Sequence, residues 1–272
     1  MKRKSFLLAI LSIACMAFAS WTGGASEPSI VKIDGHDFYS ITSPEELAWF
    51  SDQVNSGKTT INARLENDIV LNDSGSANKI SWRPIGDTLK RAFNGIFEGN
   101  GNSISRLYYK KASSNIFVKF LAIGLFGVVD EQGVVRNVAV KDAQISASAS
   151  VDDWGRNGMA YSGGIVGYNK GYVENVSFSG NISVYASGAS SSTYISKSMG
   201  FSYGGGVAGY NAGHIKNVSV SGVISASHND EINTGETCGG GIVGYAAAGS
   251  SVKNSTNNAY VKGSSETVVG IL

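Results

Sequence analysis

The residues best suited to chemistry are two adjacent carboxylates, Asp152 and Asp153, in the stretch VDDWGR, which also holds Arg156. Two carboxylates can bind calcium or act as acid and base in glycoside cleavage. Successive residues on a strand point to opposite faces, so this pair converges only on a turn. We find no second stretch like VDDWGR in the chain. Asp152 and Asp153 are therefore weak metal-ligand candidates, a solvated surface loop is the favoured alternative, and we expect no catalytic residue.

Histidines and glycine-rich stretches give weaker chemical signals. His36, His214 and His228 are the only histidines, and no two of them stand at the spacing of metal ligands. The glycine-rich phrases lack the Lys and the following helix of a phosphate-binding loop. We therefore expect neither a metal centre nor a cofactor.

Aromatic residues between repeated segments are better candidates for binding. Tyr and Trp side chains among small polar residues suit stacking on sugar rings or contact with a protein. The alternative is that these rings fold back and cover the wall of the fold. We expect three longer segments, residues 149–162, 186–203 and 227–240, to emerge as loops on one side. Their candidate binding residues are Trp154, Tyr161, Tyr194, Phe201 and Tyr203.

An internal repeat must position these segments. Four stretches open alike, with GLFG at 124, GIVGY at 164, GVAGY at 206 and GIVGY at 241, so the openings are 40, 42 and 35 residues apart. A sequence motif that recurs while the length of the repeat unit varies predicts a solenoid whose coils carry loops of different size. An Asn follows the openings after 13, 11, 11 and 13 residues, at Asn137, Asn175, Asn217 and Asn254.

Within each unit, the side chains alternate as in a strand with one buried face. In VENVSFSG the large apolar residues are Val173, Val176 and Phe178, and we expect them to fill the core. The Gly pairs at the openings suit tight corners with positive φ. Asn175 and its equivalents tolerate the left-handed region. We expect them to stack into a ladder that satisfies buried polar groups along the solenoid.

The stretch before the repeats carries helix and strand signals. An N-cap Ser, a first-turn Pro and a capping-box Glu in SPEE, residues 43–46, predict the start of a helix. Its apolar face comprises Leu47, Phe50 and Val54, and Gly57 ends it. Such a helix can cap the open end of a solenoid. Residues 60–72 alternate like a first coil, and residues 93–109 place apolar residues around three glycines.

The repeated phrases GGIVGYNKGYVENVSFSG, GGVAGYNAGHIKNVSVSG and GGIVGYAAAGSSVKNS resemble the GLUG motif of bacterial secreted and surface proteins. The upstream run from SPEELAWF to FNGIFEGNGNSISRLYY is similar to the segment that precedes GLUG repeats, so the resemblance covers about residues 40–262. It implies a right-handed parallel β-helix of the filamentous-haemagglutinin or pectin-lyase-like type, and an adhesin. Some GLUG arrays accompany an immunoglobulin A peptidase domain, which nothing in this sequence resembles. The motif brings no catalytic residues to carry over.

The first nineteen residues have the pattern of an export signal. A basic start, KRK, precedes an apolar run over residues 6–16, and AFA at 17–19 is a cleavage site. The run is too short to span a membrane. We expect a secreted or cell-surface bacterial protein. A lipoprotein anchored at Cys15 is the less favoured alternative, because Ser12 stands where a lipobox normally has Leu.

Composition excludes two classes of protein. Removing the signal takes away three positive charges, so the net charge changes from +1 to (22 − 3) − 21 = −2. A nearly neutral chain has no electrostatic footprint for nucleic acid, and no later segment is apolar enough to span a membrane. The one remaining cysteine, Cys238, has no disulfide partner within the mature chain, and we expect it to be a small buried filler.

We divide the chain into a signal peptide (1–19), a lead-in (20–42), a cap helix with the first coils (43–123) and GLUG-type coils (124–272). The last repeat departs from the pattern, with Ala246, Ala247 and Ala248 replacing the usual turn and Ser255 replacing Val. No C-terminal cap is recognisable. An uncapped last coil would present unpaired strands that can associate end to end with another copy.

The fold class expected from these patterns is all-β: a right-handed parallel β-helix with a short N-terminal capping helix. On this scaffold we expect an exported, non-enzymatic adhesion or interaction module that presents same-side loops to a glycan or to a host or surface protein. The alternative is a polysaccharide lyase or hydrolase on the same scaffold. That alternative requires at least three convergent polar residues on adjacent coils.

Overall fold

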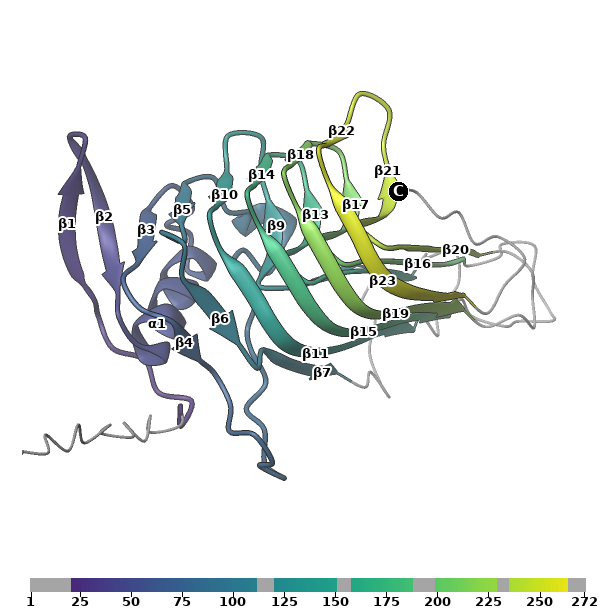
Figure 1. Cartoon of the computed structure of the whole chain (residues 1–272), viewed down its shortest axis with the longest axis horizontal. Helices are drawn as coiled ribbons and strands as arrows, with labels where there is room; N and C mark the ends of the chain where they lie inside the picture. The colour runs from purple at the N-terminus through teal and green to yellow at the C-terminus, as the bar shows by residue number, and fades with distance from the viewer. Residues whose placement is uncertain (1–20, 112–119, 151–157, 188–198, 229–234, 264–272) are drawn as a thin grey trace, which may run out of the picture.

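The computed structural model describes residues 21–111, 120–150, 158–187, 199–228 and 235–263. Strands arranged in four sheets make up most of this part of the chain, together with helix α1 (Pro44–Asn55) and a single 3₁₀ turn, Leu89–Arg91 (Figure 1). The all-β class predicted from the sequence is confirmed for these residues.

Sheet A has the strand order β1-β2-β3-β5-β10-β14-β18-β22. All of its pairs are parallel except the antiparallel pair β1–β2. Its strands are β1 (Ser29–Ile33), β2 (His36–Ile41), β3 (Asn62–Leu65), β5 (Ile96–Glu98), β10 (Val134–Arg136), β14 (Tyr172–Glu174), β18 (His214–Lys216) and β22 (Ser251–Lys253).

Sheet B has the order β23-β19-β15-β11-β6-β4, and β7 also pairs with β11. All of these pairs are parallel. Its strands are β4 (Ile69–Val70), β6 (Ser103–Ser105), β7 (Tyr108–Lys111), β11 (Ala139–Ser150), β15 (Ser177–Ser187), β19 (Ser219–His228) and β23 (Thr256–Gly263).

Two smaller parallel sheets complete the architecture. Sheet C has the order β21-β17-β13-β9, and sheet D has the order β20-β16-β12-β8. Sheet C contains β9 (Phe126–Val129), β13 (Val166–Asn169), β17 (Ala208–Asn211) and β21 (Val243–Ala246). Sheet D contains β8 (Phe120–Ile123), β12 (Gly158–Gly163), β16 (Gly200–Gly205) and β20 (Glu236–Gly240).

Each coil visits the sheets in the same order. Strands β12, β13, β14 and β15 pass through sheets D, C, A and B, and β16–β19 and β20–β23 repeat this path beside them (Figure 1). Equivalent residues therefore stack, and Val173 lies in register between Val135 and Ile215. Stacked parallel sheets fit the expected solenoid, although no sheet closes on itself.

The core lies between the sheets and is built from the predicted apolar positions. Val173, Val176 and Phe178 are all buried, as expected from their alternation. Burial of a side chain of this size contributes about 1.5–3 kcal/mol. In the first coils, the packed positions are Phe97, Ile104 and Leu107, all fully buried.

Helix α1 begins and ends where its signals predict. The Glu46 N–H donates to the Ser43 hydroxyl (3.3 Å), while the Glu46 carboxylate accepts from the backbone N–H of Thr42 (2.6 Å). Its apolar face is buried, with Phe50 packing edge-on against Phe93 at 6.0 Å between ring centroids. The helix is joined to the core of the first coils by this contact.

The lead-in contains a hairpin that the sequence prediction missed. Strands β1 and β2 are joined by Asp34 (φ 51°) and Gly35 (φ 83°). Asp-Gly with both residues at positive φ is the turn that best matches the twist of a two-residue hairpin. The alternating stretches on either side of this dipeptide were the available signal. The hairpin extends sheet A beyond the first coil.

The corner Asn residues take the predicted left-handed conformation, with φ between 51° and 57°. Asn217 donates to Asn175 Oδ1 (2.9 Å), and Asn175 donates to Asn137 Oδ1 (3.0 Å). The ladder is thus present but lies at an exposed edge, because the corner turns outward to solvent. A buried Asn pair is formed instead by Asn169 and Asn211, the last residues of the two GYN triplets.

The Gly pairs at the openings do not adopt the positive φ that we expected. Their role is close approach: a Cβ on Gly206 would overlap the Val220 side chain and the Gly241 carbonyl. A Cβ on Gly164 would likewise overlap the ring of Phe178. The absence of a side chain at the openings lets sheet B pack against them.

The three segments expected to be loops are partly strands, which corrects the prediction. β12, β16 and β20 occupy the later part of each segment. The physical reason is that small residues on these strands fit the narrow space beneath sheet B, where Ala160 and Ser202 are fully buried. The middle of each segment lies outside the described residues.

Candidate functional site

Two of the predicted binding residues are buried in a stack of rings. Tyr161 on β12 and Tyr203 on β16 lie in register, with ring centroids 5.2 Å apart and planes 4° from parallel. Only 6% and 5% of these residues are exposed. Phe201 is half-buried beside Tyr203, at 6.4 Å. The remaining candidates, Trp154 and Tyr194, and the weak metal ligands Asp152 and Asp153 lie outside the described residues.

These rings belong to a larger tyrosine ladder that spans sheets C and D. Tyr168 stacks on Tyr210 at 4.7 Å, and Tyr203 stacks on Tyr245 at 5.0 Å. Offset stacking of this kind adds about 0.5–1.5 kcal/mol per pair. In this part of the chain, the rings cover the wall rather than present a free face. The tyrosine ladder is defined by Tyr161, Tyr168, Tyr203, Tyr210 and Tyr245.

The Tyr203 hydroxyl and the neighbouring Cys238 thiol are held protonated. The Tyr203 hydroxyl donates to Glu236 (3.0 Å), and burial, followed by the charge of Glu236, raises the pKa of Tyr203. Burial, together with a hydrogen bond to Glu236, raises the pKa of the Cys238 thiol to about 12. A thiol with so little thiolate is a poor nucleophile. Cys238 is therefore the buried filler that we expected.

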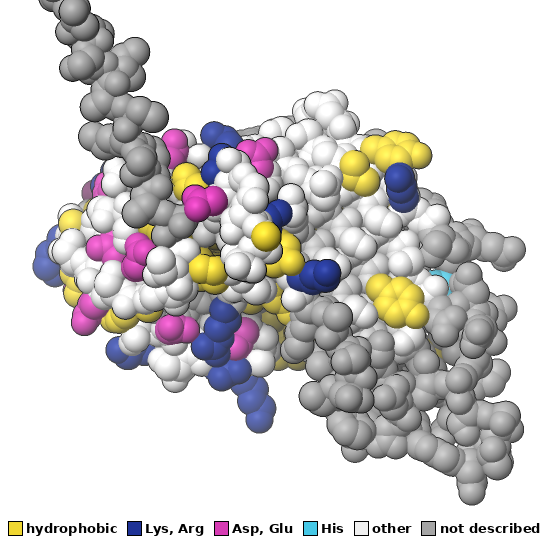
Figure 2. Space-filling view, turned by 90° about the horizontal axis from the view of Figure 1, so that it is seen from below, with side chains coloured by type: hydrophobic (Ala, Val, Ile, Leu, Met, Phe, Trp, Pro, Cys, Tyr) yellow, Lys and Arg dark blue, Asp and Glu magenta, His cyan; other side chains and the backbone are white. Residues whose placement is uncertain are grey.

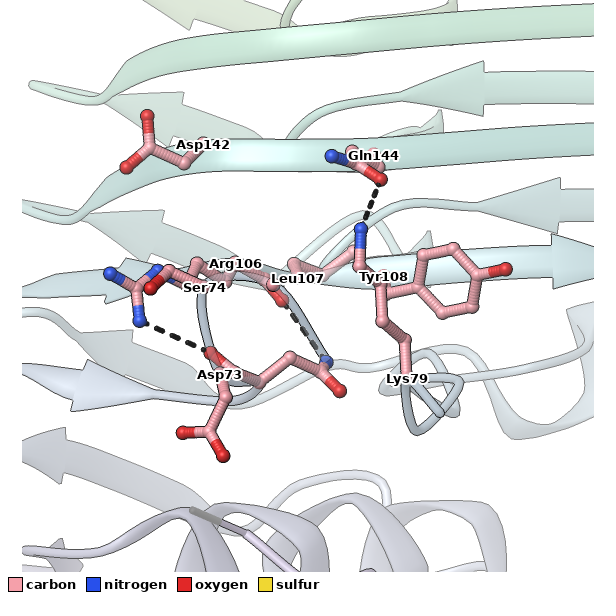
Figure 3. A pocket seen from close by; sticks show the side chains of 10 residues that line it. Asp73, Ser74, Lys79, Arg106, Leu107, Tyr108, Asp142 and Gln144 are labelled. Atoms are coloured by element: carbon pink, nitrogen blue, oxygen red, sulfur yellow. Dashed lines mark hydrogen bonds between the residues drawn. The ribbon is translucent and has the colours of Figure 1, made fainter. Parts of the chain in front are cut away.

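A pocket of about 300 Å³ opens on the outer face of sheet B (Figure 3). It lies where the loop after β4 meets the junction of β6 with β7 and the start of β11. Polar side chains dominate its lining, and polar groups placed in a pocket fix the orientation of a bound ligand. The lining residues are Asn72, Asp73, Ser74, Gly75, Lys79, Arg106, Leu107, Tyr108, Asp142 and Gln144.

Two lining residues hold an unusual backbone conformation. Arg106 has φ 58° and Asp142 has φ 52°, at the same position of adjacent coils. The left-handed region costs about 1–2 kcal/mol for a residue with a Cβ, and Asp tolerates it better than Arg. Among the described residues with positive φ, Arg106 alone is neither Gly, Asn nor Asp.

The following coils make the same bend differently. β11 bulges between Val140 and Ala143 relative to β15, so Asp142 has no counterpart there. The next two coils bend at Gly180 (φ 151°) and Gly222 (φ 114°). Bulges and strained residues concentrate where a side chain must be aimed at a ligand. The side chains of Arg106 and Asp142, the two residues with strained backbone, line the same pocket, and we therefore take this pocket as the candidate site.

A buried amide fixes the edge of the pocket. Asn72 donates to the carbonyls of Arg106 and Ile80 (both 3.1 Å), and its Oδ1 accepts from the Ile80 N–H (2.7 Å). Arg106 Nη1 in turn donates to the Asn72 carbonyl at 3.4 Å. These bonds close the loop of residues 72–80 against the bend at Arg106.

The other side of the pocket is formed by Lys79, Tyr108 and Gln144. The Lys79 ammonium donates to Gln144 Oε1 (2.7 Å) and lies 5.5 Å from the centre of the Tyr108 ring. Figure 3 shows Arg106 and Lys79 on either side of Leu107, with Asp142 and Gln144 on the strand above them. Strands β7 and β11 therefore position Tyr108, Asp142 and Gln144, whereas Arg106 and Lys79 lie on the connections between strands.

A shallow groove of about 470 Å³ continues from the pocket across the coils, sharing Tyr108 and Gln144 with it. Its floor contains rows of side chains in register, most of them polar, spaced about 4.8 Å apart across parallel strands. Figure 2 shows charged side chains gathered over the N-terminal part of this side, while the part over the later coils is mostly white. Two rows are Gln144–Asn181–Val223 and Ser146–Ser183–Ser225.

Sequence reasoning missed this site because its residues are not repeated. The signal was present in the stacking of the coils: SRL at residues 105–107 and KDA at 141–143 align at a bend where later coils have glycine. Of the histidines, His214 lies on the exposed face of sheet A and His228 contacts Thr237. The described residues contain no group of three or more His, Cys, Asp or Glu able to hold a metal.

Comparisons with known proteins find partial likenesses. No family model matches the chain, so the GLUG resemblance stays a prediction. The chain is 34% identical over 96 residues, or 35% of its length, to a "Putative Gly-rich membrane protein" of Evansella cellulosilytica, of which it covers 9%. It is 27% identical over 116 residues, or 40% of its length, to the "Halomucin" of Haloquadratum walsbyi, of which it covers 1%. The chain thus spans less than a tenth of these relatives, whose names fit a role at or outside the cell surface.

One solved structure corrects an expectation. A protein from Bacteroides ovatus described as a "putative immunoglobulin A1 protease" matches 83% of this chain and 67% of its own, with 18% identity and a TM-score of 0.48. Because that description is of an enzyme, the expectation that the chain is non-enzymatic is contradicted. At this level of similarity we transfer neither the activity nor the fold of that protein to this chain. No helix of the described residues is long and apolar enough to cross a membrane.

Proposed function

We propose that the chain is an exported interaction module of the GLUG type, built on a right-handed parallel β-helix, and that it binds a glycan in the pocket and groove of sheet B. The observation that carries the proposal is Arg106, which keeps a strained left-handed conformation while its side chain lines the pocket. The membrane-protein and halomucin names of the relatives support a place outside the cell. Trp154 and Tyr194 remain proposed contact residues of the module.

The chemistry of the groove favours a glycan over a protein partner. Cores of protein interfaces are enriched in large aromatic and apolar side chains. The rows here instead combine amides and hydroxyls, such as Asn181, Ser183 and Ser225, with apolar surface from residues such as Val223. A sugar carries many hydroxyls that these groups can bind, and Tyr108 supplies a ring on which a sugar face can stack. The groove runs across the strands, so an extended oligosaccharide would contact several coils.

Binding of a panel of oligosaccharides to the purified chain tests the proposal, with the Tyr108→Ala and Gln144→Ala variants as probes. Tyr172→Ala is the matched control, because Tyr172 is 48% exposed and lies on sheet A. We expect each probe variant to lose affinity about tenfold, which corresponds to 1.4 kcal/mol, while Tyr172→Ala binds like the parent. If the chain binds none of the oligosaccharides, or if Tyr172→Ala loses as much affinity as the probe variants, a glycan site on sheet B is refuted.

A further inference from the structure

We infer that the pocket recognises an acidic group of the glycan, a carboxylate or a sulfate, through Arg106 and Lys79. This inference rests on the proposed function and specifies the class of ligand. It concerns the pocket alone, since the groove beyond it is lined mainly by uncharged residues.

Arg106 differs from the other described arginines in its partners. Arg64, Arg83, Arg91 and Arg136 each form an ion pair with a carboxylate, at N–O distances of 2.7–3.5 Å. Arg106 has no carboxylate partner within the described residues, and its guanidinium donates to the Asn72 carbonyl. A guanidinium has five N–H donors in a planar fork that fits a carboxylate or a sulfate-like oxyanion. Most of these donors are therefore available to a ligand.

Lys79 provides a second positive charge in a held position. Its ammonium is fixed by Gln144 and by the face of the Tyr108 ring, and neither partner neutralises its charge. It forms no ion pair with an acidic side chain of the described part of the chain. An ordered cation loses little side-chain entropy when a ligand binds, so the site is preorganised for an anion.

The carboxylates of the pocket do not cancel these charges. Asp73 and Asp142 line it but pair with neither cation, and Figure 3 shows the Asp73 carboxylate directed away from Lys79. Lys110 lines the adjoining groove, so the cations Arg106, Lys79 and Lys110 outnumber the carboxylates Asp73 and Asp142 among the lining residues. An acidic sugar would place its charged group here and extend its uncharged part along the groove.

Three probes with one backbone test the inference: an unsulfated chondroitin oligosaccharide, its sulfated form, and the unsulfated form with its carboxyl groups reduced to alcohols. The proteins are the full chain, Arg106→Gln, Lys79→Gln and the control Lys216→Gln, which removes a cation from sheet A. We expect the full chain and the control to bind at least one acidic probe about tenfold more tightly than the neutral probe, because hydrogen bonds to charged groups are the stronger ones. Arg106→Gln and Lys79→Gln should each reduce that preference.

The three probes distinguish a carboxylate from a sulfate as the recognised group. They also distinguish a failure of the acidic subsite from a failure of the glycan site itself. Preference for the unsulfated acidic probe over the neutral one assigns a carboxylate, and a further gain with the sulfated probe assigns a sulfate. Equal binding of all three probes, or a preference kept by both variants, overturns the acidic subsite and leaves the glycan site standing. If none of the probes and no oligosaccharide of the wider panel binds, both proposals are refuted together.

Discussion

The side-chain amide of Asn169 donates to Oδ1 of Asn211 at 2.8 Å, and both residues are fully buried. The Oδ1 of Asn211 also accepts from the Gly213 N–H (3.2 Å), and its amide donates to the Gly213 carbonyl (3.2 Å). Asn169 makes the same two bonds to Gly171. Each Asn thus closes the turn of its own coil, and the two are joined through the interior.

Asn211→Ala should lower the free energy of unfolding by about 2–3 kcal/mol, because it leaves buried polar groups at Gly213 and Asn169 without partners. Urea unfolding measures the difference. Asn258→Ala is the control, because Asn258 is an exposed amide on β23, and it should cost less than about 0.5 kcal/mol. Equal costs for the two variants would show that the buried pair is dispensable.

The corner Asn residues allow a separate test of backbone conformation. Asn175 has φ 53°, so Asn175→Ala should destabilise the fold by about 1–2 kcal/mol through left-handed strain. Asn175→Gly loses the same exposed side-chain bonds but keeps an allowed backbone, and should cost clearly less. The melting temperatures of the two variants rank them. If Gly proves as damaging as Ala, the ladder bonds rather than the conformation make the corner.

Close approach at the openings predicts a strong effect of a single methyl group. Gly206→Ala places a Cβ against Val220 and the Gly241 carbonyl, and should destabilise the fold by about 3 kcal/mol or more, since backbone cannot move aside cheaply. Gly24→Ala is the control, because a Cβ there meets nothing within 4 Å. Chemical denaturation of both variants decides the point, and a stable Gly206→Ala variant would contradict the packing.

Acid should weaken the first coils through Glu98. Burial alone would raise the pKa of this carboxyl, but hydrogen bonds from Asn137, from the Asn100 N–H and from Arg136 outweigh burial and hold it below its ordinary value of 4.5. A lowered folded pKa means that the stabilisation is complete above the unfolded pKa. It is lost as pH falls below about 4.5 and through the folded value.

Melting temperatures of the parent and of Glu98→Gln between pH 7 and pH 2 measure this contribution. The parent should lose stability over the acid limb more steeply than the variant, since Gln does not titrate. Asp68, whose pKa is lowered by hydrogen bonds from the Ser103 backbone and hydroxyl, remains as background in both proteins. Parallel acid limbs would show that the bonds to Glu98 do not depend on its charge.

Sequence alone predicts those features that depend on local chemistry or on a repeated pattern. Helix α1 follows from its caps, the core from alternation around Val173 and Phe178, and the left-handed corners from the recurring Asn. The prediction that the Gly pairs adopt positive φ was wrong. Their actual role, close approach to another sheet, depends on contacts between residues distant in the chain. For the same reason, Tyr161 and Tyr203 were expected to be exposed although they stack in register.

The pocket could not be predicted for a physical reason of its own. Its parts are a loop fastened by Asn72, a bend at Arg106 and a bulge at Asp142, which meet only after the coils have stacked. None of them belongs to the repeated phrase. These residues are far apart in the sequence, and the register between neighbouring coils, which amino-acid composition does not reveal, brings them together in one site.

The most direct measurement is the effect of Arg106→Gly on glycan affinity and melting temperature together. Gly adopts the left-handed conformation of residue 106 without the Cβ penalty of about 1–2 kcal/mol. This gain in stability is partly offset by the greater freedom of Gly in the unfolded chain. A binding role predicts a melting temperature equal to or above that of the parent and an affinity at least about tenfold lower. An unchanged affinity, or a variant that unfolds, would contradict the claim that Arg106 is held in its strained conformation to bind a ligand.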